Sequence, residues 1–227
     1  TANDQKTFTR TLAASEWVPS TRLVDSDNKV NIWSAKADYE ATVFNFARLE
    51  AGAKWAFSKT ANTTSRTETG PSAVNTDTRF KYRENIGAAY FSLAAQFGPK
   101  WSAKAGLRGE YTNSLGDWIT AGDQSKRSYF DLFPTAFVGF NPSAALRFSV
   151  SYTRRIQRPS YNTLNPVEYF VDAHTYTVGD PDLRPSYSDE ASFMAGFGQH
   201  FSVSTSFSHS SGLFSQLPTL KENGDQL

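Results

Sequence analysis

Hydrophobic and polar residues alternate over several long stretches of this chain. From Trp101 to Tyr111 every odd position holds an apolar residue or glycine, whereas the even positions, apart from Gly106, hold Ser, Lys, Arg and Glu. A helix would mix the charged and aromatic side chains on one face, so a period of two predicts a β-strand with one apolar and one polar face. Similar alternation recurs in residues 33–40, 47–58, 130–140, 146–153, 187–197 and 201–207.

The stretch from Phe80 to Phe97 changes its parity. Its apolar residues occupy even positions as far as Tyr90 and odd positions from Phe91 onward. A shift of one residue within a strand is typical of a β-bulge, which we therefore expect near Phe91.

The connections between the predicted strands are alternately short and long. Short turns are expected at residues 42–46, 98–100, 141–143 and 198–200, and long polar loops at Lys59–Thr78, Asn113–Arg127 and Arg155–Arg184. Long antiparallel hairpins with long loops at one end only are typical of transmembrane β-barrels. The predicted fold class is therefore all-β, an antiparallel transmembrane β-barrel segment with short periplasmic turns and long extracellular loops.

Aromatic residues lie near the ends of these predicted strands, where a barrel has its membrane-interface girdles. The expected interface aromatics are Trp55, Phe57, Trp101, Tyr111, Tyr129 and Tyr152. One face of each strand would contact outer-membrane lipid, and the charged face would line a wet lumen. A soluble β-sandwich also alternates, but its strands are usually shorter.

Composition restricts the function classes. The 227 residues include 23 Lys and Arg against 22 Asp and Glu, and this balance argues against a nucleic-acid binder. The chain has no cysteine, so disulfides and thiolate metal sites are excluded. No run reaches the roughly 18 apolar residues of a transmembrane helix, a limit that does not apply to barrel strands.

The segment Ser151–Phe193 carries three motifs close together: YTRRIQRP at Tyr152–Pro159, LNP at Leu164–Pro166 and GDPDLRP at Gly179–Pro185. In this order they resemble the barrel of TonB-dependent outer-membrane receptors, in the branch known as the outer membrane protein β-barrel family. Asp180 stands where that branch usually has Asn. The preceding Phe133–Tyr152 also fits the strand, turn and strand that lead into the motif.

The resemblance implies a barrel of about 22 strands with a plugged lumen, of which residues 1–227 would supply nine or ten. The chain is thus expected to be a partial barrel in the cell outer membrane of a Gram-negative bacterium, without the plug domain. The parent protein would import a siderophore, cobalamin or glycan. Its energy would come from the TonB complex, acting through the plug of the full-length protein, and the isolated chain is not expected to transport by itself.

The arginines of the first motif are the main candidate site. Arg154, Arg155 and Arg158 could bind anionic ligand groups or lipopolysaccharide phosphates at the outer mouth. Alternatively they pair with loop carboxylates and order the loop, and we favour this second interpretation. The carboxylates considered are Glu168, Asp172, Asp180 and Asp182. Within the same extracellular loop, Asp172, His174, Asp180 and Asp182 complete the candidate ligand-binding set.

Other chemistry finds little support. His174, His200 and His209 lie far apart in the sequence, and Asp180 with Asp182 supplies too few oxygens for calcium. Asp172 and His174 lack the glycine-rich nucleophile elbow that would support a serine hydrolase. We therefore expect no enzyme, no metal site and no cofactor.

Two alternative interpretations remain at this stage. A soluble carbohydrate-binding β-sandwich could stack sugars on exposed Trp33, Trp101 and Trp118, and a small complete outer-membrane barrel could serve as an enzyme or adhesin.

Overall fold

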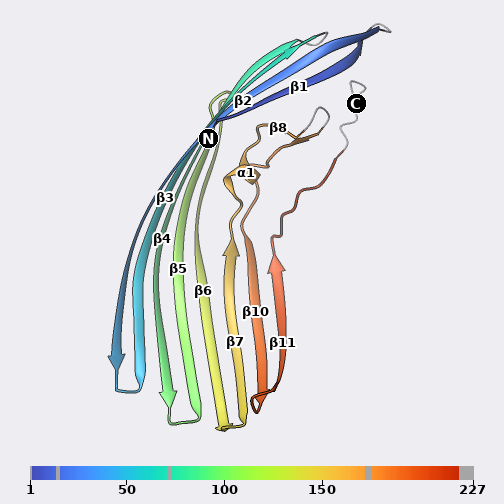
Figure 1. Cartoon of the computed structure of the whole chain (residues 1–227). Helices are drawn as coiled ribbons and strands as arrows, with labels where there is room; N and C mark the ends of the chain where they lie inside the picture. Colours follow the sequence, from blue (N-terminus) through green and yellow to red (C-terminus); the bar gives the residue numbers. More distant parts are fainter. Residues whose placement is uncertain (1, 14–15, 71–72, 172–174, 220–227) are drawn as a thin grey trace.

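The computed structural model describes residues 2–13, 16–70, 73–171 and 175–219. In these residues one antiparallel sheet of nine strands runs in the order β1-β2-β3-β4-β5-β6-β7-β10-β11, so the strands of this sheet follow one another in chain order, with β8 and β9 left out (Figure 1). The strands are β1 (Ala2–Ala13), β2 (Glu16–Val43), β3 (Ala47–Thr69), β4 (Val74–Phe97), β5 (Trp101–Trp118), β6 (Asp123–Ser143), β7 (Leu146–Gln157), β10 (Ser186–Phe197) and β11 (Phe201–Ser211). The predicted fold class is confirmed, and β1 is a strand that the alternation did not reveal.

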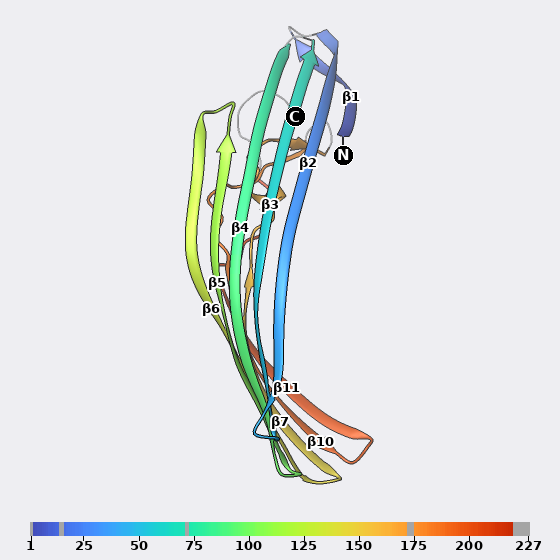
Figure 2. The ribbon, with the colours of Figure 1, turned by 90° about the vertical axis from the view of Figure 1, so that its left-hand side faces the viewer.

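Between β7 and β10 the chain forms a short helix, α1 (Tyr161–Leu164), and a small hairpin of β8 (Tyr169–Phe170) and β9 (Tyr176–Thr177). The long strands curve around this segment (Figures 1 and 2). We call the side of the sheet that carries it the concave face and the opposite side the outer face. The sheet is open, since β1 and β11 each have one strand neighbour among the described residues.

Tight turns join the strands at one end of the sheet. Three of them span residues 44–46, 98–100 and 198–200, as expected. Phe44 and Asn45 have φ of 55° and 59°, and Gly98 and Gly198 both have φ of 63°, the left-handed values that tight hairpins need.

The turn expected at residues 141–143 lies slightly further along the chain. β6 continues to Ser143 with a register shift between Phe140 and Ser143, and the turn falls on Ala144 and Ala145. A bulge therefore absorbs the Asn141-Pro142 pair, since proline cannot donate to the strand ladder.

Two of the three long loops expected from the sequence are mostly strand. β3 and β4 stay paired as far as Glu68 opposite Val74, and β5 and β6 as far as Trp118 opposite Asp123. The expectation was wrong because it took polar residues as a sign of a loop. A ladder is held by backbone hydrogen bonds, and beyond the membrane its side chains need not be apolar.

The bulge expected near Phe91 is also absent, because β4 keeps one register with both neighbours from Phe80 to Ala95. The even residues of β4, including Phe80 and Tyr90, therefore lie on one face, and Phe91 lies on the other. The change of parity in the sequence marks aromatic residues that the concave face buries, and not a kink.

The outer face carries a continuous apolar band. Partners such as Ala53, Ala89, Gly109 and Leu132 lie opposite one another on successive strands, which places their side chains on one face. The band takes alternate residues, none of them Asp, Glu, Lys, Arg or His, from residues 33–43, 47–57, 87–97, 101–111 and 130–140. Eleven residues at about 3.4 Å each, tilted by about 45°, cover roughly 25 Å, which is the height of a barrel's lipid-facing band.

Aromatic rings border this band at the turn end. Ring centroids are 4.2 Å apart for Trp101 and Phe140, 6.5 Å for Phe140 and Phe148, and 5.8 Å for Phe197 and Phe201. At the other border Trp55 stacks on Phe57 at 6.3 Å. Aromatic rings at both borders, with Trp101 at one and Trp55 at the other, are what a bilayer interface favours.

Five of the six expected interface aromatics lie on the outer face, and Tyr129 does not. Tyr129 is the partner of Thr112, whose side chain is fully buried on the concave face. The assignment of Tyr129 to the outer aromatics is therefore corrected. On β6 the outward positions are even-numbered, so the outward aromatic at this level is Phe130.

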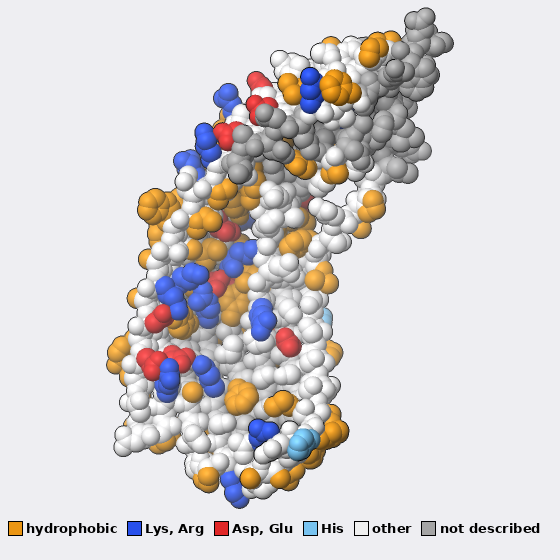
Figure 3. Space-filling model, in the orientation of Figure 1, with side chains coloured by type: hydrophobic (Ala, Val, Ile, Leu, Met, Phe, Trp, Pro, Cys, Tyr) orange, Lys and Arg blue, Asp and Glu red, His pale blue; other side chains and the backbone are white. Residues whose placement is uncertain are grey.

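The concave face is charged, and several of its charges are paired (Figure 3). Lys36 Nζ lies 2.7 Å from Asp38 Oδ2, Lys104 Nζ lies 3.0 Å from Glu50 Oε2, and Arg48 bonds Glu40. Charges of both signs that neutralise one another are compatible with a hydrated interior. No helix in the described residues is long and apolar enough to span a membrane.

Candidate functional site: the loop over the concave face

The segment from Arg158 to Pro185, here called the inner loop, leaves the end of β7 and lies against the concave face (Figures 1 and 2). Its helix α1 begins after Ser160, whose side-chain oxygen accepts a hydrogen bond from Thr163 N at 3.3 Å. The Thr163 hydroxyl in turn donates to Ser160 O at 2.7 Å. Serine at this position satisfies a helix N–H that would otherwise lack a partner.

An aromatic stack holds α1 to the sheet. Phe80 of β4 has no exposed surface, and its ring centroid lies 5.2 Å from that of Trp118 and 5.5 Å from that of Tyr161. Leu164 beside it is 6% exposed. Burial raises the pKa of the Tyr161 hydroxyl, which therefore stays neutral at physiological pH. Apolar contact thus positions the start of the inner loop.

Arg158 links the inner loop to β5. Its Nη2 donates to Glu110 Oε2 at 2.6 Å and to Thr112 Oγ1 at 3.0 Å. Arg108 donates to the other oxygen of the same carboxylate. Burial acts to lower the pKa of Arg158, but the hydrogen bonds and charges of Glu110 and Tyr129 together outweigh it, and the pKa is raised. Arg158 is therefore held as a cation against a carboxylate of the sheet.

Arg127 of β6 holds the far part of the inner loop through backbone oxygens. Its two terminal nitrogens donate to the carbonyl oxygens of Leu183 and Pro181. Asp182 lies 3.9 Å from Arg127 Nη2 but is 91% exposed, so this ion pair adds little.

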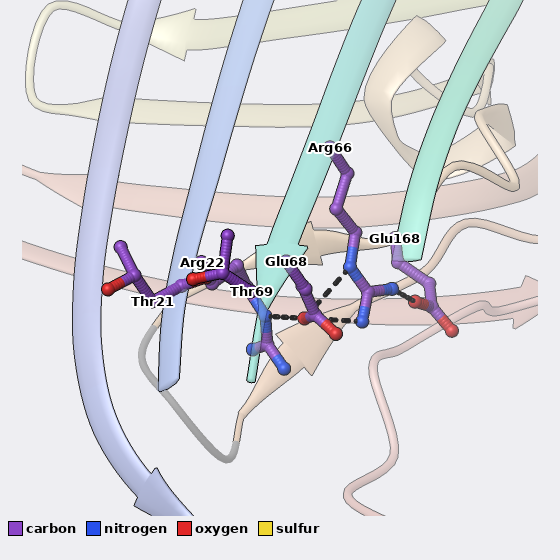
Figure 4. A network of polar contacts seen from close by, with 6 residues as sticks. All are labelled: Thr21, Arg22, Arg66, Glu68, Thr69 and Glu168. Carbon is purple, nitrogen blue, oxygen red and sulfur yellow. Dashed lines mark hydrogen bonds and ion pairs between the residues drawn. The ribbon is translucent and has the colours of Figure 1, made fainter. Parts of the chain in front are cut away.

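A third contact joins the inner loop to β2 and β3. Arg66 Nη1 donates to Glu168 Oε2 at 3.3 Å, and Arg66 Nη2 donates to Glu68 Oε1 at 2.7 Å (Figure 4). Arg22 of β2 donates to the same Glu68 oxygen. Figure 4 shows Glu168 approaching the strands from the inner loop, so this network spans two strands and the loop.

The second and third sequence motifs pack directly on each other. Gly179 N donates to Asn165 O, and Asp180 N donates to Thr163 O, both at 2.8 Å. A Cβ at Gly179 would lie 2.6 to 2.7 Å from backbone atoms of Asn165 and Thr163. Only glycine permits this approach. The three motifs are therefore parts of one folded loop: the first binds the sheet, and the other two close the loop on itself.

The arginines predicted as one cluster separate in the structure. Only Arg158 enters the concave site, whereas the guanidinium of Arg154 lies 5.3 Å from the ring centroid of Tyr187. Tyr187 in turn donates to Asp131 Oδ1 at 2.9 Å. Arg155 is exposed and forms no ion pair with a described residue.

The carboxylates favoured as partners of these arginines are not their partners within the described residues. The inner-loop acids Glu168 and Asp182 face Arg66 and Arg127 of the sheet, while Arg158 of the loop faces Glu110 of the sheet. Asp180 caps its own turn, its Oδ1 accepting from Asp182 N at 2.8 Å. Asp172 and His174 lie outside the described residues. The sequence could not show that the charged residues of the loop pair with the sheet, because their partners Arg66 and Glu110 lie far away in the chain.

Sequence reasoning missed the residues of the sheet that receive the inner loop. Glu110 and Thr112 were read only as part of an alternating polar face, and Phe80 as an apolar strand residue. One signal in the sequence could have placed Phe80 and Tyr82 on the charged face. Both occupy even positions of β4, and the charged residues Arg108 and Glu110 of the neighbouring β5 also occupy even positions. In the described residues no group of three or more His, Asp or Glu is placed to hold a metal ion.

The contact region retains polar atoms without a partner. Asp131 Oδ2, Arg158 Nε and Trp118 Nε1 are buried and lack a hydrogen bond. Buried polar groups are normally satisfied by protein or water, so these atoms are the ones at the junction of inner loop and sheet that could bind ordered water. A small crevice at this junction is lined by residues that include Tyr82, Ser114 and Arg127.

Comparison with known proteins agrees with this architecture. The model of the outer membrane protein beta-barrel family matches residues 1–227. The chain belongs to this family. Its place is therefore the outer membrane, and the apolar band on its outer face is the surface that meets lipid. No curated protein sequence matches the chain.

A solved structure shares the fold. The ferric citrate transporter FecA, in its unliganded form, aligns with a TM-score of 0.52 at 12% identity, over 86% of this chain and 32% of that chain. The chain thus spans about a third of the length of that transporter. Membership of the family replaces the soluble sandwich alternative. That alternative had three tryptophans stacking on sugars. Trp33 and Trp101 lie on the lipid-facing band instead, and Trp118 is buried under the inner loop.

Proposed function

We propose that residues 1–227 form part of the barrel of a TonB-dependent outer-membrane receptor that imports a nutrient such as a siderophore, cobalamin or glycan. The observation that carries the proposal is the inner loop, which folds onto the charged concave face and is held there by pairs such as Arg158 and Glu110. A loop in this position narrows the lumen and presents side chains to a solute that enters from outside.

The likeness to a transporter barrel and the three motifs support the same role. In this proposal the energy comes from a TonB complex that acts on a plug domain within the full-length protein. The proposed role is transport and not catalysis. The concave face, with its balanced charges and Tyr90, suits a polar solute better than an apolar one.

The proposal is tested in the bacterium that carries the gene. A strain lacking the gene and a strain lacking TonB function are given radiolabelled ferric siderophores, cobalamin and labelled oligosaccharides. We expect uptake of one of these classes to fall to background in both strains and to return when the gene is restored. Unchanged uptake of every class in the deletion strain, under conditions where the wild type expresses the protein, would overturn the proposal.

A further inference from the structure

A row of basic residues crosses the outer face beyond the apolar band, on the side away from the tight turns. Lys59 of β3 is the register partner of Arg83 of β4, Arg83 is the partner of Leu115 of β5, and Leu115 is the partner of Lys126 of β6. All four thus lie on one line across the sheet. We call Lys59, Arg83 and Lys126 the basic row.

The three side chains of the basic row are exposed, and none forms an ion pair with a described residue. Several basic residues of the concave face behave differently, since Lys36, Arg48 and Lys104 each have an acidic partner there. On the outer face one row further out, Lys29 is paired with Asp27 at 3.2 Å, and Asp117 accepts from Gln124 at 3.3 Å. Lys81 and Arg79, further out on the same face of β4, are also exposed and form no ion pair with a described residue, so the basic row is the part of this unpaired positive charge that lies nearest the apolar band.

The pairing within the row is unfavourable by itself. Residues directly opposite on neighbouring antiparallel strands have Cβ atoms about 5 Å apart, and like charges there destabilise the sheet. Lys59 and Arg83 stand in this relation. An anion between them removes the repulsion and makes the arrangement favourable. Lys and Arg projecting from the left edge of the upper half of the molecule, above hydrophobic side chains, are visible in Figure 3.

The height of the row identifies the anion. Lys59 follows the band residue Phe57 by two positions, and Lys126 precedes Phe130 by four. In a tilted strand this is about 5 to 10 Å beyond the apolar band, the depth of the polar headgroups of the bilayer. Because the turn end of the sheet faces the periplasm in barrels of this type, these headgroups belong to the outer leaflet.

We propose that the basic row binds the phosphate groups of a lipid of the outer leaflet, whose acyl chains lie on the apolar band below. Strands are about 4.8 Å apart, so Lys59 and Arg83 can contact one phosphate together, and Lys126 lies about 10 Å further along for a second. The guanidinium fork of Arg83 suits phosphate oxygens, and the two ammonium groups supply charge. This site is separate from the lumen and goes beyond the proposed transport function.

The test uses the full-length protein purified from outer membranes in non-ionic detergent. Wild type is compared with a variant carrying Lys59→Gln, Arg83→Gln and Lys126→Gln, and with a matched control carrying Lys36→Gln, Lys54→Gln and Lys104→Gln on the concave face. The probes are bisphosphorylated lipid A, the same lipid without its phosphates, and inorganic phosphate at 10 mM as a competitor. Native mass spectrometry measures the bound lipid, and the heat-dependent shift in gel mobility shows that each variant is folded.

Each basic group removed is expected to weaken binding of bisphosphorylated lipid A about fivefold, since a basic residue near a charged membrane contributes about 1 kcal/mol. The triple variant should therefore bind it about 100-fold more weakly, while the control variant binds it as wild type does. Equal binding by the folded triple variant, or equal binding of the dephosphorylated lipid, would overturn the proposal. Complete displacement by inorganic phosphate would also overturn it, since it would indicate a site for free phosphate.

If the triple variant does not fold, single Lys59→Gln and Lys126→Gln variants are measured in its place. Each is expected to show the fivefold loss, and wild-type binding by both would count against the proposal.

Discussion

Arg158 Nη2 lies 2.6 Å from Glu110 Oε2, although 48 positions separate the two residues in the sequence. The pair joins the first residue of the inner loop to the middle of β5. Its side chains are 19% and 10% exposed, so the two charges largely depend on each other and on Arg108 and Thr112 for solvation. This contact converts a family sequence motif into an anchor on the lumen side of the barrel.

Replacing Arg158 by Gln should destabilise the protein by about 3 kcal/mol, since it leaves Glu110 buried with one cation fewer. The double variant with Glu110→Gln should cost less than the sum of the two single changes. The measurement is urea unfolding in lipid vesicles, with chymotryptic cleavage after Tyr161 as a probe of inner-loop release. Arg155→Gln is the matched control, and equal effects of the Arg155 and Arg158 changes would show that the pair does not anchor the loop.

The stack around Phe80 should make the inner loop sensitive to high pH. Burial raises the pKa of Tyr161 above its unfolded value near 10. A raised pKa means that the stabilisation is complete below about pH 10 and is lost as the pH rises toward the folded value. Between about pH 10 and 12 we expect the fluorescence of Trp118 to shift to the red as the stack opens.

The matched variant for this prediction is Tyr161→Phe, which keeps the ring and removes the ionisable group. Its Trp118 emission should change less over the same pH range than that of wild type, even though other tyrosines and the lysines titrate in both proteins. Identical titration curves for the two proteins would assign the change to those other groups.

Neighbouring residues of β6 should differ sharply in their tolerance of charge. Ala136 lies near the middle of the lipid-facing band, and Thr135 lies on the concave face; both are exposed in the isolated chain. Ala136→Arg is expected to cost about 2 to 4 kcal/mol in a bilayer, while Thr135→Arg should cost far less because its charge enters the wet lumen. Folded yield in the outer membrane and unfolding in lipid vesicles measure the difference. A reversed order would mean that the faces are assigned the wrong way round.

Two glycines on paired strands offer a further comparison. A Cβ at Gly52 of β3 would lie 2.5 Å from Tyr90 Oη and 2.7 Å from the carbonyl oxygen of Ala37, whereas a Cβ at Gly87 of β4 meets nothing within 4 Å. Gly52→Ala is therefore expected to cost about 1 to 3 kcal/mol, because Tyr90 and the backbone of β2 must both move. Gly87→Ala should be neutral or slightly stabilising. Thermal unfolding distinguishes the two, and a neutral Gly52 variant would contradict the close packing of Tyr90.

Alternation was sufficient to predict strands wherever one face meets lipid. Trp101 to Tyr111 is the clearest case, since every outward position there has to be apolar and every inward position has to be compatible with water. Beyond the band this rule no longer holds. The strands continue past Lys59 and Asn113 with polar side chains on both faces. Alternation therefore identified the parts of β3 and β5 next to the tight turns, but it took the parts beyond the apolar band for loops.

Inward-facing aromatics misled the same reasoning. Phe80 and Tyr82 of β4 are apolar or aromatic residues at concave positions, and they were read as outward residues separated by a bulge from Phe91. Tyr129 of β6 was likewise placed in the outer ring. These residues are aromatic because the inner loop packs beside them, and that contact comes from a segment about 80 residues away in the case of Phe80 and Tyr161.

The amino-acid sequence by itself determined the class of fold, the direction of the hairpins, the lipid-facing band and, through its three motifs, the family. These properties depend on local periodicity and turn chemistry, which act between residues close in the chain. The tertiary structure decided which side chains meet: Arg158 with Glu110, Glu168 with Arg66, Arg127 with the carbonyls of Pro181 and Leu183, and Lys59 beside Arg83. Strand register and loop placement fix these pairs, and both follow from the summed packing of the whole sheet and not from any one segment.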